Sequence, residues 1–311
     1  DAINQLPGIE MTTINQIELT PVFVPFAKEV LETMQSSEGG LGMAIAAEEE
    51  WTGGDFVICR LVADTGETGL GEAFVWLPET GVSPEQLIDS IEKSLGRYVI
   101  GESPFNVEQI RHQMEINVNR SDVAKGLIDM ACYDLMGRIT ERPASDFMGG
   151  CCLDEIPLAA LIPLLEPQTM LGFCQLFQST GIQTFRLKLG QSIQNDIEIV
   201  STIRNALGSD IRLRVDYNQA YTPPDAVRAI KAIEPFGIDV VEQPVAATNY
   251  AGMVYVQEHV DVPVMAHEGC FSLQDISTLV QMGGINVIGL NSERPGGVTN
   301  MLRALSHAEM I

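Results

Sequence analysis

Three acidic residues recur at a regular interval in the second half of the sequence, each at the end of a short apolar run. Glu242 follows Asp216 by 26 residues, and Glu268 follows Glu242 by 26 more. One β/α unit fits this interval, so we expect the three acids to converge at the C-terminal mouth of a barrel. Converging carboxylates repel one another unless a cation neutralises them, and oxygen ligands suit Mg²⁺, or Mn²⁺ in its place. The sequence therefore predicts a divalent-metal site.

Two basic residues end the apolar run that precedes the first acid. Arg186 and Lys188 are two positions apart, as are Asp216 and Asn218, so each pair shares one face of its strand. A lysine close to another cation and a metal has a lowered pKa and can act as a general base. Taken singly, a strand-end acid is usually a solvated cap, a lone lysine is usually a surface residue, and Arg186 could be a structural partner of the acids. Their recurrence in consecutive units favours a functional cluster.

The elements that must position these residues fall into two patterns. Residues 1–145 predict an α+β domain, with strands at 14–24, 55–64 and 70–75 and helices that open at Ser83, Ser103 and Ser121. From residue 146 to 311, short β-like runs alternate with amphipathic helical stretches, which is typical of parallel β/α architecture. The predicted strands there are 156–162, 184–189, 211–215, 238–242, 263–266 and 287–290. The predicted fold is thus α/β, a (β/α) barrel with an N-terminal α+β domain.

Composition excludes several function classes. The net charge is −24, from 42 acidic and 18 basic residues, so nucleic acid and anionic membrane surfaces would be repelled. No apolar run approaches the roughly 20 residues that cross a bilayer. The six cysteines fit neither a zinc site nor a disulfide framework, which favours a reducing cytoplasm. The acidity itself is most simply a solubility feature.

These motifs together resemble the mandelate racemase and muconate lactonizing enzyme branch of the enolase superfamily. The stretch 62–73 resembles its second and third strands, and 124–150 resembles the helix that leads into its barrel. The pairs Arg186 and Lys188, Asp216 and Asn218, the triplet Glu242-Gln243-Pro244 and the fifth-strand acid are similar to its catalytic signatures. The resemblance covers essentially the whole chain.

The resemblance implies a role for each residue of the cluster. Lys188 would be the base on one face of the substrate, Arg186 would tune it, and Asp216, Glu242 and Glu268 would bind Mg²⁺. The metal would bind the carboxylate of a small-molecule substrate and stabilise the enolate that forms when the α-proton leaves. It also implies a homo-oligomer, an N-terminal capping domain and a capping loop at 25–54. A disordered acidic insertion is the alternative for the middle of that loop.

Three features depart from the family pattern. Arg186 replaces a lysine, and it stays charged, so it can still depress the pKa of Lys188. His267 precedes Glu268 and could be a ligand, a second acid/base or a neighbour; we favour a neighbour or a substrate contact. Asn291 stands where related enzymes carry a lysine or an aspartate that serves the opposite face. An amide cannot carry that proton, which favours one-base chemistry over two-base racemisation.

The number of strands also bears on the expected fold and function. A closed barrel needs eight strands and the sequence supplies six, so we expect a barrel that is truncated in this chain. The expected activity is that of an isomerase (racemase, epimerase or cycloisomerase), with an acid-sugar dehydratase as the alternative. A relative that binds metal but has lost catalysis is a third possibility, for which Lys188→Ala would change nothing. The hypothesis of an unrelated barrel enzyme that binds phosphate is weaker, because no Gly-rich phosphate loop follows the strands.

Overall fold

The computed structural model describes residues 12–28, 31–32 and 52–310, which form two compact units. The first unit holds the described residues up to Val24 together with Asp55–Cys152 and Asn291–Arg303. The second holds Leu153–Leu290, the described residues of Ala304–Ile311 and those of Pro25–Gly54. Most of the predicted capping loop, residues 33–51, lies outside the described part of the chain. The boundary predicted between residues 145 and 146 stays a prediction.

A three-stranded sheet forms the centre of the first unit. Its strands lie in the order β1 (Ile14–Pro25), β2 (Gly53–Ala63) and β3 (Thr68–Phe74). β2 and β3 are antiparallel, with Phe56 opposite Phe74. Burial alternates along β2, where every second side chain from Val57 onward is buried, as expected for a strand with one face on a core. The three predicted strands agree with the observed ones within a few residues.

Helices follow the sheet, and their starts match the polar residues that precede them. They are α2 (Leu77–Thr80), α3 (Pro84–Lys93), α4 (Val107–Asn117) and α5 (Asp122–Thr140), with the short 3-10 turns η2 (Leu95–Tyr98), η3 (Pro104–Asn106) and η4 (Ala144–Met148). Ser83 and Gln86 form the predicted capping box at the start of α3. Ser103 opens only η3, which runs into α4, and α5 begins directly after Ser121.

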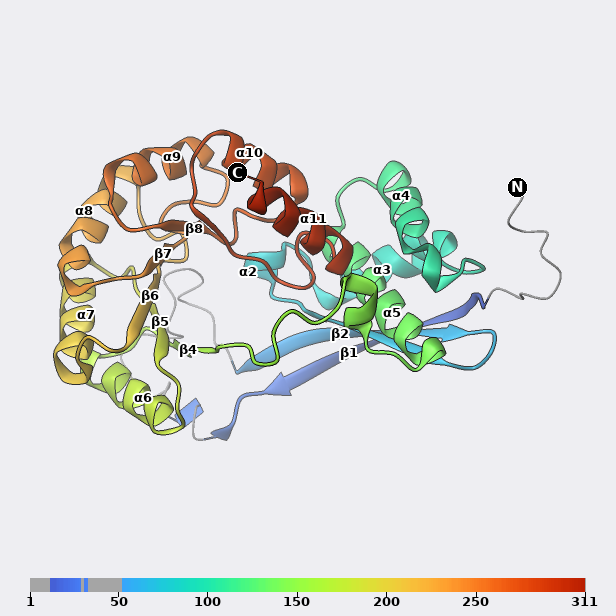
Figure 1. Ribbon diagram of the computed structural model, residues 1–311, viewed down its shortest axis with the longest axis horizontal. Helices are drawn as coiled ribbons and strands as arrows, with labels where there is room; N and C mark the ends of the chain where they lie inside the picture. The colour runs from blue at the N-terminus through green and yellow to red at the C-terminus, as the bar shows by residue number, and fades with distance from the viewer. Residues whose placement is uncertain (1–11, 29–30, 33–51, 311) are drawn as a thin grey trace. The chain divides into compact units, whose positions relative to one another are not determined.

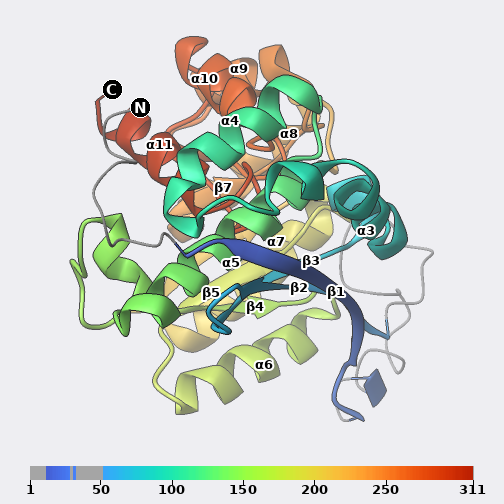
Figure 2. The same cartoon turned by 90° about the vertical axis from the view of Figure 1, so that its right-hand side faces the viewer.

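Two glycines in β3 allow α5 to lie against the sheet (Figure 2). A Cβ atom added at Gly71 would lie 2.2 Å from the carbonyl oxygen of Leu127, and one added at Gly69 would lie 2.4 Å from that of Ala131. Such distances are far inside van der Waals contact, and a backbone carbonyl cannot move aside as a flexible side chain can. The close packing of β3 on α5 therefore requires glycine at both positions.

The second unit contains a six-stranded parallel sheet whose strands follow chain order. The strands are β4 (Ala159–Ile162), β5 (Thr184–Lys188), β6 (Arg212–Asp216), β7 (Val240–Glu242), β8 (Val264–Ala266) and β9 (Val287–Ile288). The connecting helices are α6 (Pro167–Ser179), α7 (Ile193–Leu207), α8 (Pro223–Ile233) with η5 (Glu234–Phe236), α9 (Tyr250–His259) and α10 (Leu273–Gln281). They lie along the outer side of the curved sheet, and α11 (Val298–Glu309) follows β9 (Figure 1).

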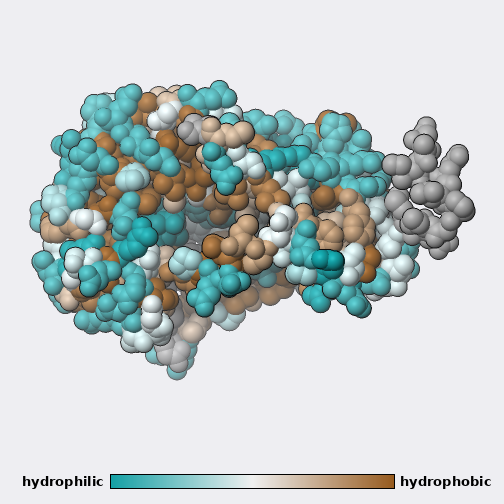
Figure 3. Space-filling model, in the orientation of Figure 1, coloured by the Kyte–Doolittle hydropathy of each residue, from teal (hydrophilic) through white to brown (hydrophobic). Residues whose placement is uncertain are grey.

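The core of this unit lies between the sheet and its helices. Phe185, Leu213 and Val241 on successive strands are fully buried, as are Ile199 and Ile230 on the helices. Figure 3 shows hydrophilic residues along the outer rim of the unit and hydrophobic ones on its inner side. Burial alternates along β4, where Ala160 and Ile162 are buried and Leu161 is 49% exposed, so the sheet is covered on the face that packs against the helices.

Five of the six strands predicted in the barrel unit are longer than the observed ones, by one to three residues. Ile156 and Leu158 are 77% and 69% exposed, and β4 begins only at Ala159. The prediction that residues 156–158 belong to the strand was wrong, because an apolar run reports composition and not hydrogen-bond pairing. The last strand, β9, similarly covers two residues of the four predicted.

Candidate active site

The predicted catalytic residues stand at one edge of the barrel sheet. Lys188, Asp216 and Glu242 are the last residues of β5, β6 and β7, and Glu268 follows the end of β8 by two positions. The parallel register places Lys188 opposite Asp216, and Asp216 opposite Glu242. All four side chains are buried, with exposures between 0% and 6%. The matched spacing in the sequence thus becomes a contiguous row of charges at the C-terminal ends of the strands.

Lys188 is held by two oxygen acceptors. Its Nζ donates to Asp216 Oδ2 at 2.7 Å and to Asn218 Oδ1 at 2.5 Å. The Asn218 Nδ2 in turn donates to Glu268 Oε1 at 2.7 Å. Asn218 therefore links the predicted base to the predicted fifth-strand ligand, a more central place than its sequence position alone indicated.

Arg186 bridges two of the carboxylates. Its Nη2 lies 2.5 Å from both Asp216 Oδ2 and Glu242 Oε1, and its Nε donates to Glu242 Oε2 at 2.8 Å. Burial opposes the charged guanidinium, but the charges of Asp216 and Glu242 outweigh burial and raise the pKa of Arg186. Arg186 is thus a permanent cation at the centre of the cluster, and it lies beside Lys188 on the same face of β5.

A second arginine belongs to the cluster and was missed in the sequence. Arg214 donates to Glu242 Oε2 from Nε at 2.8 Å and from Nη2 at 2.5 Å. Its position two residues before Asp216 places it on the same face of β6, so the strand periodicity that paired Arg186 with Lys188 also contained this signal.

The two acids nearest Asn218 have pKa values that move in opposite directions. Burial raises the pKa of Asp216, but Lys188 and Arg186 outweigh it and the net shift is downward. Burial and the charge of Asp216 raise the pKa of Glu268, against a smaller opposing effect of His267. The cations of the cluster thus neutralise the charges of Asp216 and Glu242, whereas the charge of Glu268 is compensated less well.

His267 lies beside two of the acids. Its Nδ1 is 3.2 Å from Glu242 Oε1 and 3.9 Å from Glu268 Oε2. That position agrees with a neighbour of the ligand set, the interpretation favoured from the sequence, although its role stays a prediction.

Asn291 belongs to the other compact unit. Its Nδ2 donates to Glu293 Oε1 at 3.1 Å, and its backbone amide donates to the carbonyl of Arg294. The structure therefore brings six of the seven predicted residues together in the barrel unit, and Asn291 lies in the loop between β9 and α11.

The chemistry of the donor set fits a hard divalent cation. Three carboxylates stand at the ends of adjacent strands, and Glu268 Oε2 is buried without a hydrogen-bond partner among the described residues. Within the same described part of the chain, no group of three or more His, Cys, Asp or Glu side chains is arranged to hold a metal as it stands. Arg186 Nη2 instead contacts both Asp216 and Glu242. A bound cation would thus compete with Arg186 for carboxylate oxygens that suit it.

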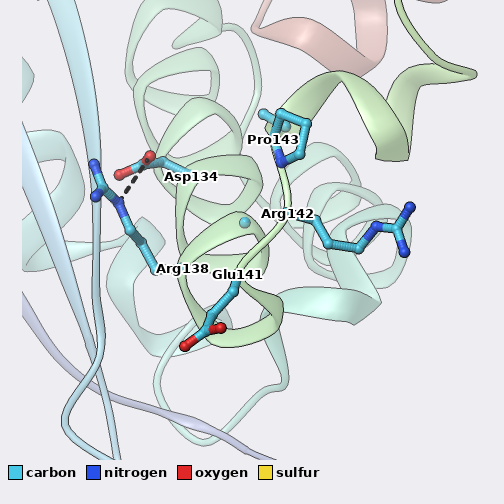
Figure 4. Close-up of a pocket in the computed structure, with 7 residues that line it drawn as sticks. Asp134, Arg138, Glu141, Arg142 and Pro143 are labelled. Atoms are coloured by element: carbon cyan, nitrogen blue, oxygen red, sulfur yellow. Dashed lines mark ion pairs between the residues drawn. The ribbon is translucent and has the colours of Figure 1, made fainter.

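A pocket of about 520 Å³ lies elsewhere, in the first unit at the end of α5. It is lined by Asp134, Gly137, Arg138, Glu141, Arg142, Pro143 and Ala144. Arg138 pairs with Asp134 at 3.5 Å, whereas Arg142 points away from them (Figure 4). The pocket contains none of the residues that carry the predicted chemistry, so we do not assign the active site to it.

Comparison with known proteins identifies the family. Residues 33–149 match the model for the mandelate racemase / muconate lactonizing enzyme N-terminal domain, and residues 171–311 match the enolase C-terminal domain-like model. A hydrophobic dipeptide epimerase from Enterococcus faecalis is 36% identical over 80% of this chain and 70% of its own length. The chain belongs to the mandelate racemase and muconate lactonizing enzyme family.

Solved structures of this family superpose closely on the chain. The Enterococcus faecalis dipeptide epimerase in complex with Mg and the dipeptide L-Leu-L-Tyr has a TM-score of 0.85 at 31% identity, with 95% of this chain and 80% of that chain covered. A muconate lactonizing enzyme from Pseudomonas fluorescens with muconolactone has a TM-score of 0.87 at 26% identity, with 97% and 78% covered. The magnesium in the first structure agrees with the predicted cofactor.

The comparisons confirm the family, the barrel with its N-terminal capping domain, and an isomerase of the enolase superfamily as the class of enzyme. Among the described residues, no helix is both long enough and apolar enough to cross a membrane. The roles of the individual site residues, the homo-oligomer and the cytoplasmic location stay predictions.

Proposed function

We propose that the protein is a Mg²⁺-dependent isomerase that removes the proton α to the carbonyl or carboxylate of a small dipeptide-like or N-acyl amino acid substrate. The observation that carries the proposal is the buried row of Lys188, Asp216, Glu242 and Glu268 at the ends of consecutive strands. The 36% identity to a dipeptide epimerase supports the substrate class.

Each residue has a definite task in this proposal. Asp216, Glu242 and Glu268 hold the metal, which supplies Lewis-acid stabilisation of negative charge on the substrate. Lys188 takes the α-proton at Nζ, and Asn218 and Asp216 orient that amine through the hydrogen bonds described above. Arg186 lies beside Lys188 on the same face of β5 and neutralises the carboxylates of Asp216 and Glu242.

Asn291 favours a second candidate, a cycloisomerisation that needs a single proton transfer. Its amide side chain does not titrate, so it cannot return a proton from the opposite face. The Pseudomonas fluorescens neighbour with bound muconolactone has that kind of product in its site. Both candidates use Lys188 and the same three acids. Epimerisation removes an α-proton and returns one on the other face of the substrate, whereas cycloisomerisation closes a ring and transfers a single proton through Lys188.

The proposal is tested by NMR in D₂O with Mg²⁺. The panel holds dipeptides, N-acyl amino acids and muconate. An epimerase produces the second diastereomer with deuterium at the α-carbon, one-base chemistry produces exchange without inversion, and a cycloisomerase produces a lactone. Activity should vanish in Lys188→Ala and with chelator, and it should survive in Lys231→Ala, which removes an exposed lysine of the same unit. Turnover that persists in Lys188→Ala would refute the assignment of the base.

A further inference from the structure

Gln243 directly follows Glu242 and is completely buried. Its side-chain Oε1 accepts a hydrogen bond from the backbone amide of His267 at 2.9 Å and from that of Gly269 at 3.0 Å. These two amides flank Glu268 in the chain. A side chain on the loop after β7 thus holds the backbone on both sides of the acid that follows β8.

The rest of Gln243 is equally constrained. Its Nε2 donates to the carbonyl of Val245 at 2.9 Å, and its backbone amide donates to the carbonyl of Met265 at 2.9 Å. Its φ of 36° lies in the left-handed region, which non-glycine residues rarely adopt. Such a conformation persists only where the surroundings impose it, and here the cross-strand bonds do so.

Glu268 needs this support more than the other acids do. Asp216 and Glu242 are the last residues of their strands, and the parallel ladder fixes them. β8 ends at Ala266, so Glu268 lies on the loop that follows, beyond the last ladder pair of β8. Glycine at position 269 allows Gln243 Oε1 to lie close to the backbone there, because an added Cβ would lie 3.3 Å from Gln243 Oε1 and from the carbonyl oxygen of Ala247. The hydrogen bonds of Gln243 therefore fix the backbone around Glu268, where β8 no longer pairs with its neighbouring strands.

We propose that Gln243 is a positioning residue for the metal ligand Glu268, a role that rests on the proposed metal site. Replacement of Gln243 by leucine keeps a similar volume but removes the oxygen that accepts from the amides of His267 and Gly269. The loop would then relax and present the Glu268 carboxylate less well. Loss of a residue that orients a ligand typically weakens metal binding by about 10–100-fold.

The test measures metal binding without turnover. Free Mn²⁺ is followed by electron paramagnetic resonance during titration of the protein, and Mg²⁺ is then added as a competitor. The variants are Gln243→Leu and Gln243→Asn, whose side chain is one methylene shorter. The control is Gln257→Leu, which removes the hydrogen bond that the Val264 amide donates to Gln257 Oε1 at 2.9 Å, at the end of β8 opposite to Glu268. Thermal unfolding by circular dichroism verifies that each variant is folded.

We expect Mn²⁺ to bind Gln243→Leu at least about 10-fold more weakly than the parent, and Gln257→Leu to bind like the parent. Equal affinity in folded Gln243→Leu and the control would overturn the inference while leaving the metal site intact. If the leucine variant does not fold, Gln243→Asn decides by the same criterion. A parent protein that binds no Mn²⁺ would refute the proposed metal site, and the inference with it.

Discussion

Asp196 offers a quantitative test of burial in the barrel unit. This aspartate on α7 is fully buried, and it accepts hydrogen bonds from the Gly190 amide at 3.0 Å and from the Tyr221 hydroxyl at 2.6 Å. Burial raises the pKa of Asp196 from 3.8 to about 6, against the opposing effect of the two hydrogen bonds. The change to test is Asp196→Asn, which keeps the shape, can still accept from Gly190 and cannot titrate.

The sign follows from proton binding. The folded protein holds the Asp196 proton more tightly than the unfolded chain does, so the stabilisation is present at low pH and is lost as the pH rises through about 6. A shift of about 2 units corresponds to about 3 kcal/mol in total. Of this, linkage assigns about 1.4 kcal/mol to the interval from pH 5 to pH 8. The stability of Asp196→Asn relative to the parent should therefore increase by about 1.4 kcal/mol over that interval.

Urea unfolding at fixed ionic strength measures this difference at pH 5, 6, 7 and 8. Many other acids titrate in a chain of net charge −24, but they contribute equally to parent and variant and cancel. Asp210→Asn removes one charge from an exposed aspartate and should show no such trend. A parent–variant difference that is constant from pH 5 to pH 8 would show that Asp196 does not titrate there and would refute the reasoning.

Two further predictions concern packing and the metal. Gly71→Ala should lower the free energy of unfolding by about 1–3 kcal/mol, because the new Cβ would meet the Leu127 carbonyl. Gly172→Ala, on the exposed side of α6, should instead raise the free energy of unfolding by about 0.5–1 kcal/mol. Denaturant unfolding measures both changes, and equal effects of the two substitutions would contradict this prediction. Asp216→Asn should weaken Mn²⁺ binding by more than the roughly 10–100-fold expected for loss of an outer-shell partner, which an undiminished affinity in calorimetry would disprove.

The sequence predicted the barrel sheet and the convergence of its acids because both depend on local regularities. Alternation of strand and helix indicated parallel pairing, and the interval between Asp216, Glu242 and Glu268 placed each acid one unit after the last. Strand periodicity also predicted that Arg186 and Lys188 share a face, and the contacts of both with Asp216 agree.

Other features depend on three-dimensional pairing that no local pattern encodes. Strand periodicity places Arg214 on the same face as Asp216 but does not give its partner. Arg214 lies opposite Val240 and reaches forward to Glu242, so the register between the two strands sets this contact. The two bonds of Gln243 to the loop around Glu268 likewise join residues 24 and 26 positions apart. At the start of β4, Ile156 was wrongly assigned to the strand because apolarity indicates burial, and this side chain is exposed.

The chain order of the parallel strands also bears on how the protein is made. Each strand from β5 to β9 pairs with the one synthesised just before it, so the sheet can grow in the direction of translation, a few tens of residues at a time. β5 supplies Arg186 and Lys188 before any of the three acids has emerged from the ribosome. Asp216 and Glu242 then meet cations that are already in place. The order of residues along the chain thus lets charge neutralisation keep pace with synthesis.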